Sequence, residues 1–215
     1  MAALVLTLLL SYGYSIATVS VGIDTLEGDR YIGSGGVMLS TGRFGMNFWA
    51  GLLGYGKAEP SYQPGIDLLA AILLGAAAVH FCTLLRKVSN DRISMFGYGA
   101  FSCIFISYPL INEIWEYSGA NVCVCGGYLL DAIALNLLWD SWHQPGARKL
   151  LRFTAASVCM LIVCSSYESL AVVYVLAVFA MLSLQEYESK EKTQFLALVK
   201  EGLWYAAALI VGLFL

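Results

Sequence analysis

Four charged side chains follow closely behind the first apolar segment of this chain. Asp24, Glu27 and Asp29 supply carboxylates beside Arg30, and Arg43 follows after a glycine-rich run. A carboxylate can take the proton of an attacking hydroxyl, and an arginine can pair with a phosphate and stabilise it as it leaves. These residue types therefore suit transfer of a group from a phosphorylated carrier to an acceptor hydroxyl.

Further acids come from two other polar segments, which hold Glu113 with Glu116, and Glu168. Acids in loops usually only face water, and this simpler reading applies most strongly to Glu27, Glu116 and Glu168. Asp24 and Asp29 are better candidates for chemistry, because they lie where a first membrane helix would leave the lipid.

The composition sets the class of protein that must position these residues. Of the 215 residues, 59% are hydrophobic and only 13% are charged. A soluble domain of this length needs a polar shell, whereas lipid is a solvent that needs none. We therefore predict an all-α, polytopic transmembrane helix bundle. The net charge of −3 and the lack of a basic run give no sign of nucleic-acid binding.

The apolar runs predict about seven spans in a single transmembrane domain over residues 1–215. Residues 44–55 are aromatic and weakly amphipathic, which favours an interfacial helix in the first external loop, with Phe44, Phe48 and Trp49 inward. The last run stops without a flanking loop, so we expect this domain to be the N-terminal module of a longer protein. The predicted spans are 1–21, 64–85, 93–111, 122–139, 153–164, 169–184 and 201–215.

Lysine and arginine set the expected orientation, because cytoplasmic loops retain them. The polar segments after the second, fourth and sixth spans are all basic, so we expect the N-terminus in the cytoplasm and the acidic loops outside. The basic residues concerned are Arg86, Lys87, Arg92, Arg148, Lys149, Arg152, Lys190, Lys192 and Lys200.

Asp131 is a lone acid near the middle of the fourth span. An intramembrane acid seldom faces lipid, so we expect it to face the bundle interior and to pair with a polar group such as His80. The six cysteines lie in or beside apolar segments and away from histidine, which favours buried apolar side chains over a disulfide or a zinc site. No metal motif is present, and we expect no cofactor.

Short motifs at the expected outer ends of the spans give the chain a resemblance to a known family. They are Ile23-Asp24-Thr25 with Glu27 and Asp29, Thr41-Gly-Arg43, Tyr108-Pro-Leu-Ile-Asn-Glu113, and Ser165-Ser-Tyr-Glu168. With these motifs the chain resembles the membrane glucosyltransferases that modify bacterial O-antigen, which have the C-type glycosyltransferase fold. The resemblance covers most of residues 12–184.

The resemblance implies an enzyme of the bacterial inner membrane that acts in polysaccharide biosynthesis. The donor would be a polyprenyl-phosphate-linked sugar, glucose in this family, and the acceptor a cell-surface glycan on the extracytoplasmic face, with inversion at the anomeric carbon. A monophosphate leaving group can be neutralised by arginine alone, so no metal is required.

The family pattern also suggests roles for individual residues. Asp24 matches the first-loop acid and is the predicted general base, with Glu27 and Asp29 as alternatives. The predicted substrate-binding residues are Arg30 and Arg43 for the donor phosphate, Glu113 for orienting the sugar or acceptor, and Glu116, Tyr167 and Glu168.

Two other classes of function remain open at this point. A transporter or flippase component without covalent chemistry would place polar groups and broken helices near the middle of the bilayer, where only Asp131 is deep and acidic. A structural membrane subunit would use the loop around Asp24 to bind a partner.

Overall fold

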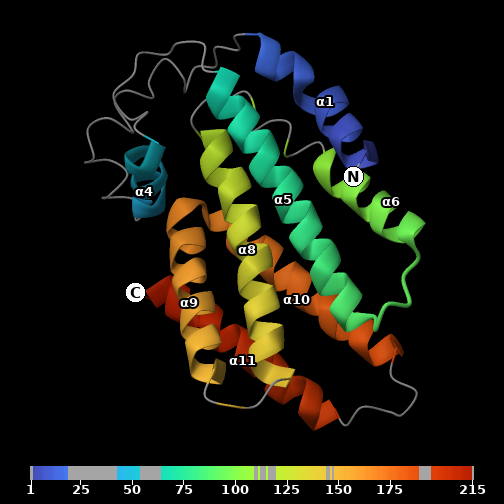
Figure 1. The fold of residues 1–215 in the computed structure, drawn as a ribbon. Helices are drawn as coiled ribbons and strands as arrows, with labels where there is room; N and C mark the ends of the chain where they lie inside the picture. Colours follow the sequence, from blue (N-terminus) through green and yellow to red (C-terminus); the bar gives the residue numbers. More distant parts are fainter. Residues whose placement is uncertain are drawn as a thin grey trace.

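The computed structural model describes residues 2–18, 43–53, 64–108, 111, 115, 120–143, 146, 148–188 and 195–214. Within these ranges the regular structure is entirely α-helical, as the apolar runs predicted (Figure 1). The helices are α1 (Ala2–Ala17), α4 (Phe44–Leu53), α5 (Pro64–Val88), α6 (Met95–Ile106), α8 (Ala120–His143), α9 (Arg148–Ser166), α10 (Glu168–Glu188) and α11 (Phe195–Phe214).

Five of the described helices are long and apolar enough to cross a membrane, namely α5, α8, α9, α10 and α11. This fits an integral membrane protein. The prediction of about seven spans is not confirmed, because α1 has 16 residues and α6 has only 12. At 1.5 Å per residue, α6 is about 18 Å long, well short of a hydrocarbon core of about 30 Å.

The early end of α6 has a local cause. Ser94 caps its start, where its side-chain oxygen accepts a hydrogen bond from the backbone N–H of Gly97. The helix ends at Ile106, and Ser107 donates its backbone N–H to the carbonyl of Cys103. Proline at position 109 disfavours helical geometry at the residue before it. The predicted span 93–111 followed hydropathy past this break and was too long.

Helix α8 lies at the centre of the bundle, with α5 on one side and antiparallel α9 on the other (Figure 1). Small residues allow close packing where other helices cross α8 and α9. An added Cβ at Gly127 on α8 would lie 2.3 Å from the side chain of Leu170 on α10. A carbon at Gly212 on α11 would lie 2.7 Å from the backbone of Met160 on α9. The crossings of α8 with α10 and of α9 with α11 therefore depend on glycine.

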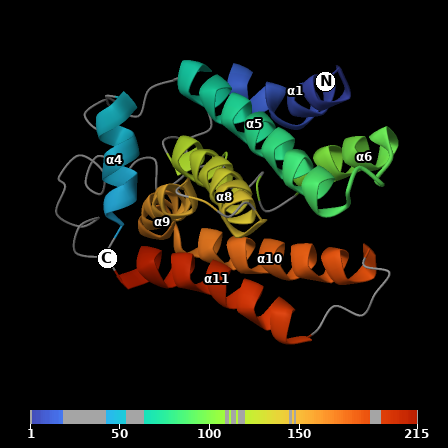
Figure 2. The ribbon, with the colours of Figure 1, turned by 60° about the horizontal axis from the view of Figure 1, so that its bottom comes forward.

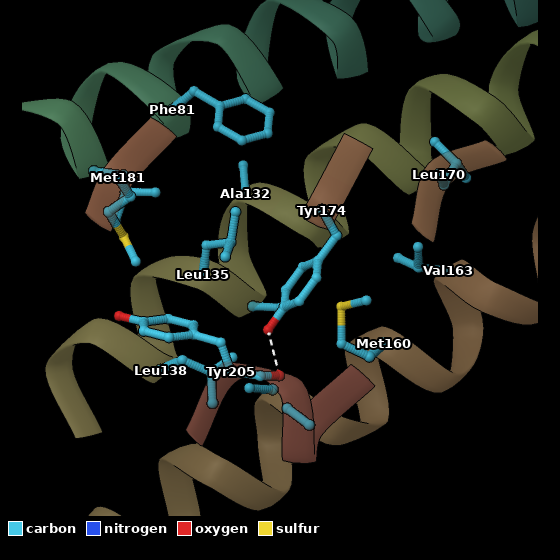
Figure 3. Close-up of a cluster of buried hydrophobic side chains, with 14 of the residues drawn as sticks. Phe81, Ala132, Leu135, Leu138, Met160, Val163, Leu170, Tyr174, Met181 and Tyr205 are labelled. Carbon is cyan, nitrogen blue, oxygen red and sulfur yellow. Dashed lines mark hydrogen bonds between the residues drawn. The ribbon is translucent and has the colours of Figure 1, made fainter. Parts of the chain in front are cut away.

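The largest hydrophobic core lies between α5, α8, α9, α10 and α11 (Figure 3). Tyr174 of α10 is almost fully buried there, and its hydroxyl donates a 3.0 Å hydrogen bond to the backbone carbonyl of Tyr205 on α11. The outer faces of α10 and α11 carry exposed apolar side chains such as Leu176, Phe179 and Ile210. Figure 2 shows these two helices side by side along one edge of the bundle.

The described basic turns lie together at one end of the bundle, which we call the basic end. Lys87 of α5 forms an ion pair of 2.9 Å with Asp140 of α8. Arg86, in the last turn of α5, pairs with Asp91 in the turn that follows, and this hydrogen bond lowers the pKa of the Asp91 carboxyl. The start of α9 lies at the same end, as the grouping of basic residues predicted, while Lys190 and Lys192 lie outside the described residues.

The opposite end, which we call the α4 end, holds the starts of α5, α8 and α10 and the end of α9 (Figure 1). The predicted helix over 44–55 is present as α4, Phe44–Leu53. Phe44 and Phe48 are exposed on its surface, whereas Trp49 turns toward α8, where its ring would meet a Cβ at Gly126.

Candidate functional site

Three of the predicted site residues meet at the α4 end. The guanidinium of Arg43 forms two hydrogen bonds to the Glu168 carboxylate, from Nη2 to Oε2 at 3.0 Å and from Nε to Oε1 at 3.4 Å. The guanidinium carbon also lies 5.4 Å from the ring centroid of Tyr167. Arg43 and Glu168 are 125 positions apart in sequence, and the fold joins them as a partly exposed pair.

The local sequence explains how Glu168 and Tyr167 come to this position. Helix α9 ends at Ser166 and α10 begins at Glu168, so Tyr167 is the single residue between them. The side chains of Ser165 and Ser166 donate hydrogen bonds back to the carbonyl of Ile162 in the last turn of α9. The predicted tight turn at Ser165-Ser-Tyr-Glu168 is confirmed.

Gly45 allows α4 to rest directly on the end of α9. A Cβ at this position would lie 2.4 Å from the Ser166 hydroxyl oxygen and 2.7 Å from the carbonyl oxygen of Ile162. Only glycine fits such a close approach without displacing a neighbour. Because Arg43 precedes α4 directly, this contact fixes where its side chain starts.

Two further contacts hold α4 against α8. Met46 is buried against Cys123, and the Trp49 ring lies where Gly126 leaves room for it. A carbon at Gly126 would lie 2.5 Å from that ring. Helix α4 is therefore held on α8 and α9 together, and the Arg43 side chain projects from a fixed helix.

The other six predicted site residues lie outside the described residues: Asp24, Glu27, Asp29, Arg30, Glu113 and Glu116. In the sequence, the first four fall between α1 and α4, and the last two fall between α6 and α8. Their roles stay predictions.

Asp67 was not singled out from the sequence, although it lies at the same end of the bundle. It sits in the first turn of α5, and its Oδ1 accepts a hydrogen bond from the side-chain amide of the buried Asn121 on α8. Asn121 in turn accepts a 2.7 Å bond from the N–H of Val122. An acid shortly after an N-terminal proline is a common signal for the start of a helix. The sequence therefore offers no reason to expect that Asp67 also bonds to α8.

Tyr12 and Trp115 form an aromatic stack near this end, with ring centroids 4.0 Å apart. The Tyr12 hydroxyl donates to the backbone carbonyl of Ile106, the last residue of α6. Tyr12 and Trp115 pack with residues of α5 and α8 in a second hydrophobic cluster. The hydrogen bond joins α1 to the end of α6, and the stack joins α1 to Trp115.

The expected pairing of Asp131 with His80 is wrong. Asp131 is fully buried in α8 as predicted, but neither of its carboxylate oxygens has a hydrogen-bond partner among the described residues. The His80 side chain is exposed, and only its backbone carbonyl faces α8, where it accepts a 3.0 Å bond from Asn136. Asn136 thus links α5 and α8 at the position expected for the acid.

The described residues contain no group of three or more His, Cys, Asp or Glu side chains that could hold a metal ion. All six cysteines are free thiols, with Cys123 and Cys125 buried and the other four half-buried. At the α4 end, the Arg43 guanidinium is instead held by the Glu168 carboxylate and the Tyr167 ring. A cation positioned in this way can bind an anion.

Comparison with known proteins places the chain. Residues 13–215 match the family model described as glucosyl transferase GtrII. The chain belongs to this family. The match covers nearly the whole sequence and confirms the resemblance to a glucosyltransferase family. No curated protein and no solved structure matches the chain.

Membership of the GtrII family supports a glycosyltransferase activity in the membrane, and it implies a sugar donor and a glycan acceptor in general terms. Within the family match lie Arg43, Tyr167 and Glu168, together with the helices that bring them into contact.

Proposed function

We propose that this protein transfers glucose from a polyprenyl-phosphate donor to a cell-surface glycan on the extracytoplasmic face of the bacterial inner membrane. The protein would use the C-type glycosyltransferase architecture and modify O-antigen. The observation that carries the proposal is the Arg43 guanidinium at the α4 end, in contact with both Tyr167 and Glu168 in a chain of the GtrII family.

The geometry of the ion pair suits a phosphate partner. Glu168 occupies the edge of the guanidinium formed by Nε and Nη2. Within the described part of the chain, the edge formed by Nη1 and Nη2 remains for a second bidentate acceptor. The Arg43 side chain is 36% exposed, which lets a headgroup reach it. Glu168 would thus position the arginine, and Arg43 would contact the donor phosphate, with Arg30 as its predicted helper.

The reaction follows from these roles. The acceptor hydroxyl oxygen attacks the anomeric carbon as the bond from that carbon to the phosphate oxygen breaks, and the configuration inverts. The hydroxyl proton passes to a first-loop carboxylate, for which we propose Asp24. Polyprenyl phosphate leaves with one more negative charge than it carried in the donor, and Arg43 stabilises this charge as it develops.

The proposal also sets the orientation. The α4 end would face outward, with Glu113 and Glu116 available to orient the sugar or acceptor, and the N-terminus would lie in the cytoplasm. A donor whose phosphate sits at headgroup depth would then meet Arg43 where helix α4 borders the bilayer surface.

A donor comparison tests the proposed function. Membranes that contain the protein should transfer labelled glucose from polyprenyl-phosphate glucose to glycan, and should not use a soluble nucleotide sugar when the lipid carrier is absent. Membranes without the protein are the control. Transfer from the nucleotide sugar alone would exclude a lipid-linked donor, and glycan labelling that does not depend on the protein would exclude the enzyme.

A further inference from the structure

A cluster of basic and aromatic side chains lies at the basic end, on the far side of the molecule from Arg43. The Lys149 ammonium of α9 lies 4.6 Å from the ring centroid of Trp204 on α11 and 5.3 Å from that of Trp142 on α8. Arg148 is exposed beside it, and Arg152 follows one turn later. Three helices therefore contribute to one cationic surface, which we call the Lys149 surface.

Two cations of this surface, Arg148 and Lys149, have no ion pair within the part of the chain that the structure describes. At the same end of the bundle, Arg86 pairs with Asp91 and Lys87 with Asp140. The positive charges of Arg148 and Lys149 are thus available to an anionic ligand, whereas Arg86 and Lys87 already pair with acids.

The aromatic side of the surface is fixed in place. The indole N–H of Trp204 donates a 2.9 Å hydrogen bond to the buried Ser141 hydroxyl, and the Phe153 ring packs 4.5 Å from the Trp204 ring. Arg152 donates from Nη1 to the backbone carbonyl of Asp140 at 3.1 Å. The ring that Lys149 contacts is therefore already fixed, so little further conformational entropy is lost when a ligand binds there.

An apolar strip begins next to these cations. Leu151 is 70% exposed and Val158 is 52% exposed, and their seven-residue spacing places them on one side of α9, beside Arg148. Since α9 is long and apolar enough to span a bilayer, this strip faces acyl chains when the helix is inserted. Cations and an outward apolar strip thus follow one another along α9, and the two tryptophans of α8 and α11 lie beside the cations, an arrangement that suits a phospholipid.

We propose that the Lys149 surface is a binding site for the headgroup of an anionic phospholipid, with the acyl chains lying along Leu151 and Val158. Arg148 can form two parallel hydrogen bonds to the phosphate, and the Lys149 ammonium adds a second positive charge. The indoles of Trp142 and Trp204 lie at the depth of the lipid headgroups. The site is separate from the α4 end and does not rest on glucosyl transfer. Each basic residue near an anionic headgroup changes occupancy by about five-fold.

Native mass spectrometry of the detergent-solubilised chain tests this site, with phosphatidylglycerol and phosphatidylcholine titrated at equal concentrations. We expect phosphatidylglycerol to bind preferentially, and Lys149→Gln and Arg148→Gln each to weaken that binding by about five-fold. Lys200→Gln is the matched control, because Lys200 is an exposed lysine on α11 near the same end.

Three outcomes would overturn the proposal. They are equal binding of the two lipids, equal losses in Lys200→Gln and Lys149→Gln, and displacement of phosphatidylglycerol by millimolar inorganic phosphate, which would reveal a site for the free anion. Arg148 is exposed, so its variant tests the site without disturbing the helix packing around Lys149.

Discussion

Arg43 and Glu168 meet edge to edge, with Nη2 3.0 Å from Oε2 and Nε 3.4 Å from Oε1. An exposed pair of this kind is weak on its own, so its value lies in the direction it gives to the guanidinium. Among the described residues, the adjacent edge of Arg43, formed by Nη1 and Nη2, is left for an anion.

Substitutions at the pair should separate donor contact from positioning. Arg43→Ala should weaken binding of polyprenyl-phosphate glucose by more than about ten-fold, because a charge-assisted bidentate contact is lost. Arg43→Lys should also bind poorly, since lysine keeps the charge but lacks the fork. Glu168→Gln should cost only about two- to five-fold, as the arginine loses orientation but not charge. The check is equilibrium binding of labelled donor to purified protein.

Two results would contradict these roles. Unchanged donor affinity in Arg43→Ala would make Arg43 a surface residue, and a Glu168→Gln loss as large as that of Arg43→Ala would place the Glu168 carboxylate in direct contact with the donor.

Gly45→Ala should disturb the packing of α4 against the end of α9. The added carbon would lie 2.4 Å from the Ser166 hydroxyl oxygen and 2.7 Å from a backbone oxygen, so the helix must shift, at a cost of about 1–3 kcal/mol. Gly51→Ala in the same helix is the matched control, because nothing lies within 4 Å of its added carbon and alanine favours helix. Thermal unfolding in detergent should show a lower midpoint for Gly45→Ala alone. Equal midpoints would mean that α4 does not rest on α9.

Tyr174→Phe should destabilise the core without changing its shape. The variant loses the buried hydrogen bond from the Tyr174 hydroxyl to the Tyr205 carbonyl, which costs about 0.5–1.5 kcal/mol. Tyr187→Phe is the control, since Tyr187 is 85% exposed. Denaturant unfolding compares the two, and a loss in Tyr187→Phe as large as in Tyr174→Phe would argue against the α10–α11 bond.

Cysteine labelling should reveal the orientation. Gly65 is exposed at the start of α5 near the α4 end, and Tyr187 is exposed near the end of α10 at the basic end. A membrane-impermeant maleimide added outside the inner membrane should reach Gly65→Cys and not Tyr187→Cys, with the unsubstituted protein reporting the background of the six native thiols. The reverse pattern would place Arg43 in the cytoplasm and contradict an extracytoplasmic donor site.

Much of the fold could be predicted because apolar length and turn residues are local signals. The Ser165-Ser-Tyr-Glu168 turn and the grouping of Arg86, Lys87 and Arg148 needed no knowledge of packing. The length of α6 was also readable, since Pro109 follows its end closely, but the hydropathy of residues 107–111 outweighed that signal.

Pairings between helices could not be predicted in the same way. Hydropathy does not tell which face of α5 meets α8, so Asp131 was expected to meet His80, whereas Asn136 bonds the His80 carbonyl. Asp67 and Asn121 are 54 positions apart, and neither residue alone indicates the other. Arg43 and Glu168 were predicted as site residues from two separate motifs. Their contact depends on the close approach of α4 to the end of α9, which Gly45 allows.

The most direct test of the account is the rate of glucose transfer from polyprenyl-phosphate glucose to glycan, measured in membranes with the protein and its Asp24→Asn, Asp29→Asn and Glu113→Gln variants. Asparagine keeps the size of the proposed base but cannot accept the proton, so Asp24→Asn should transfer about 10²–10⁴-fold more slowly while donor binding persists. Asp29→Asn and Glu113→Gln should lose less. Near-normal transfer by Asp24→Asn with none by Asp29→Asn would move the base to Asp29, and no transfer by the unsubstituted protein would contradict the account itself.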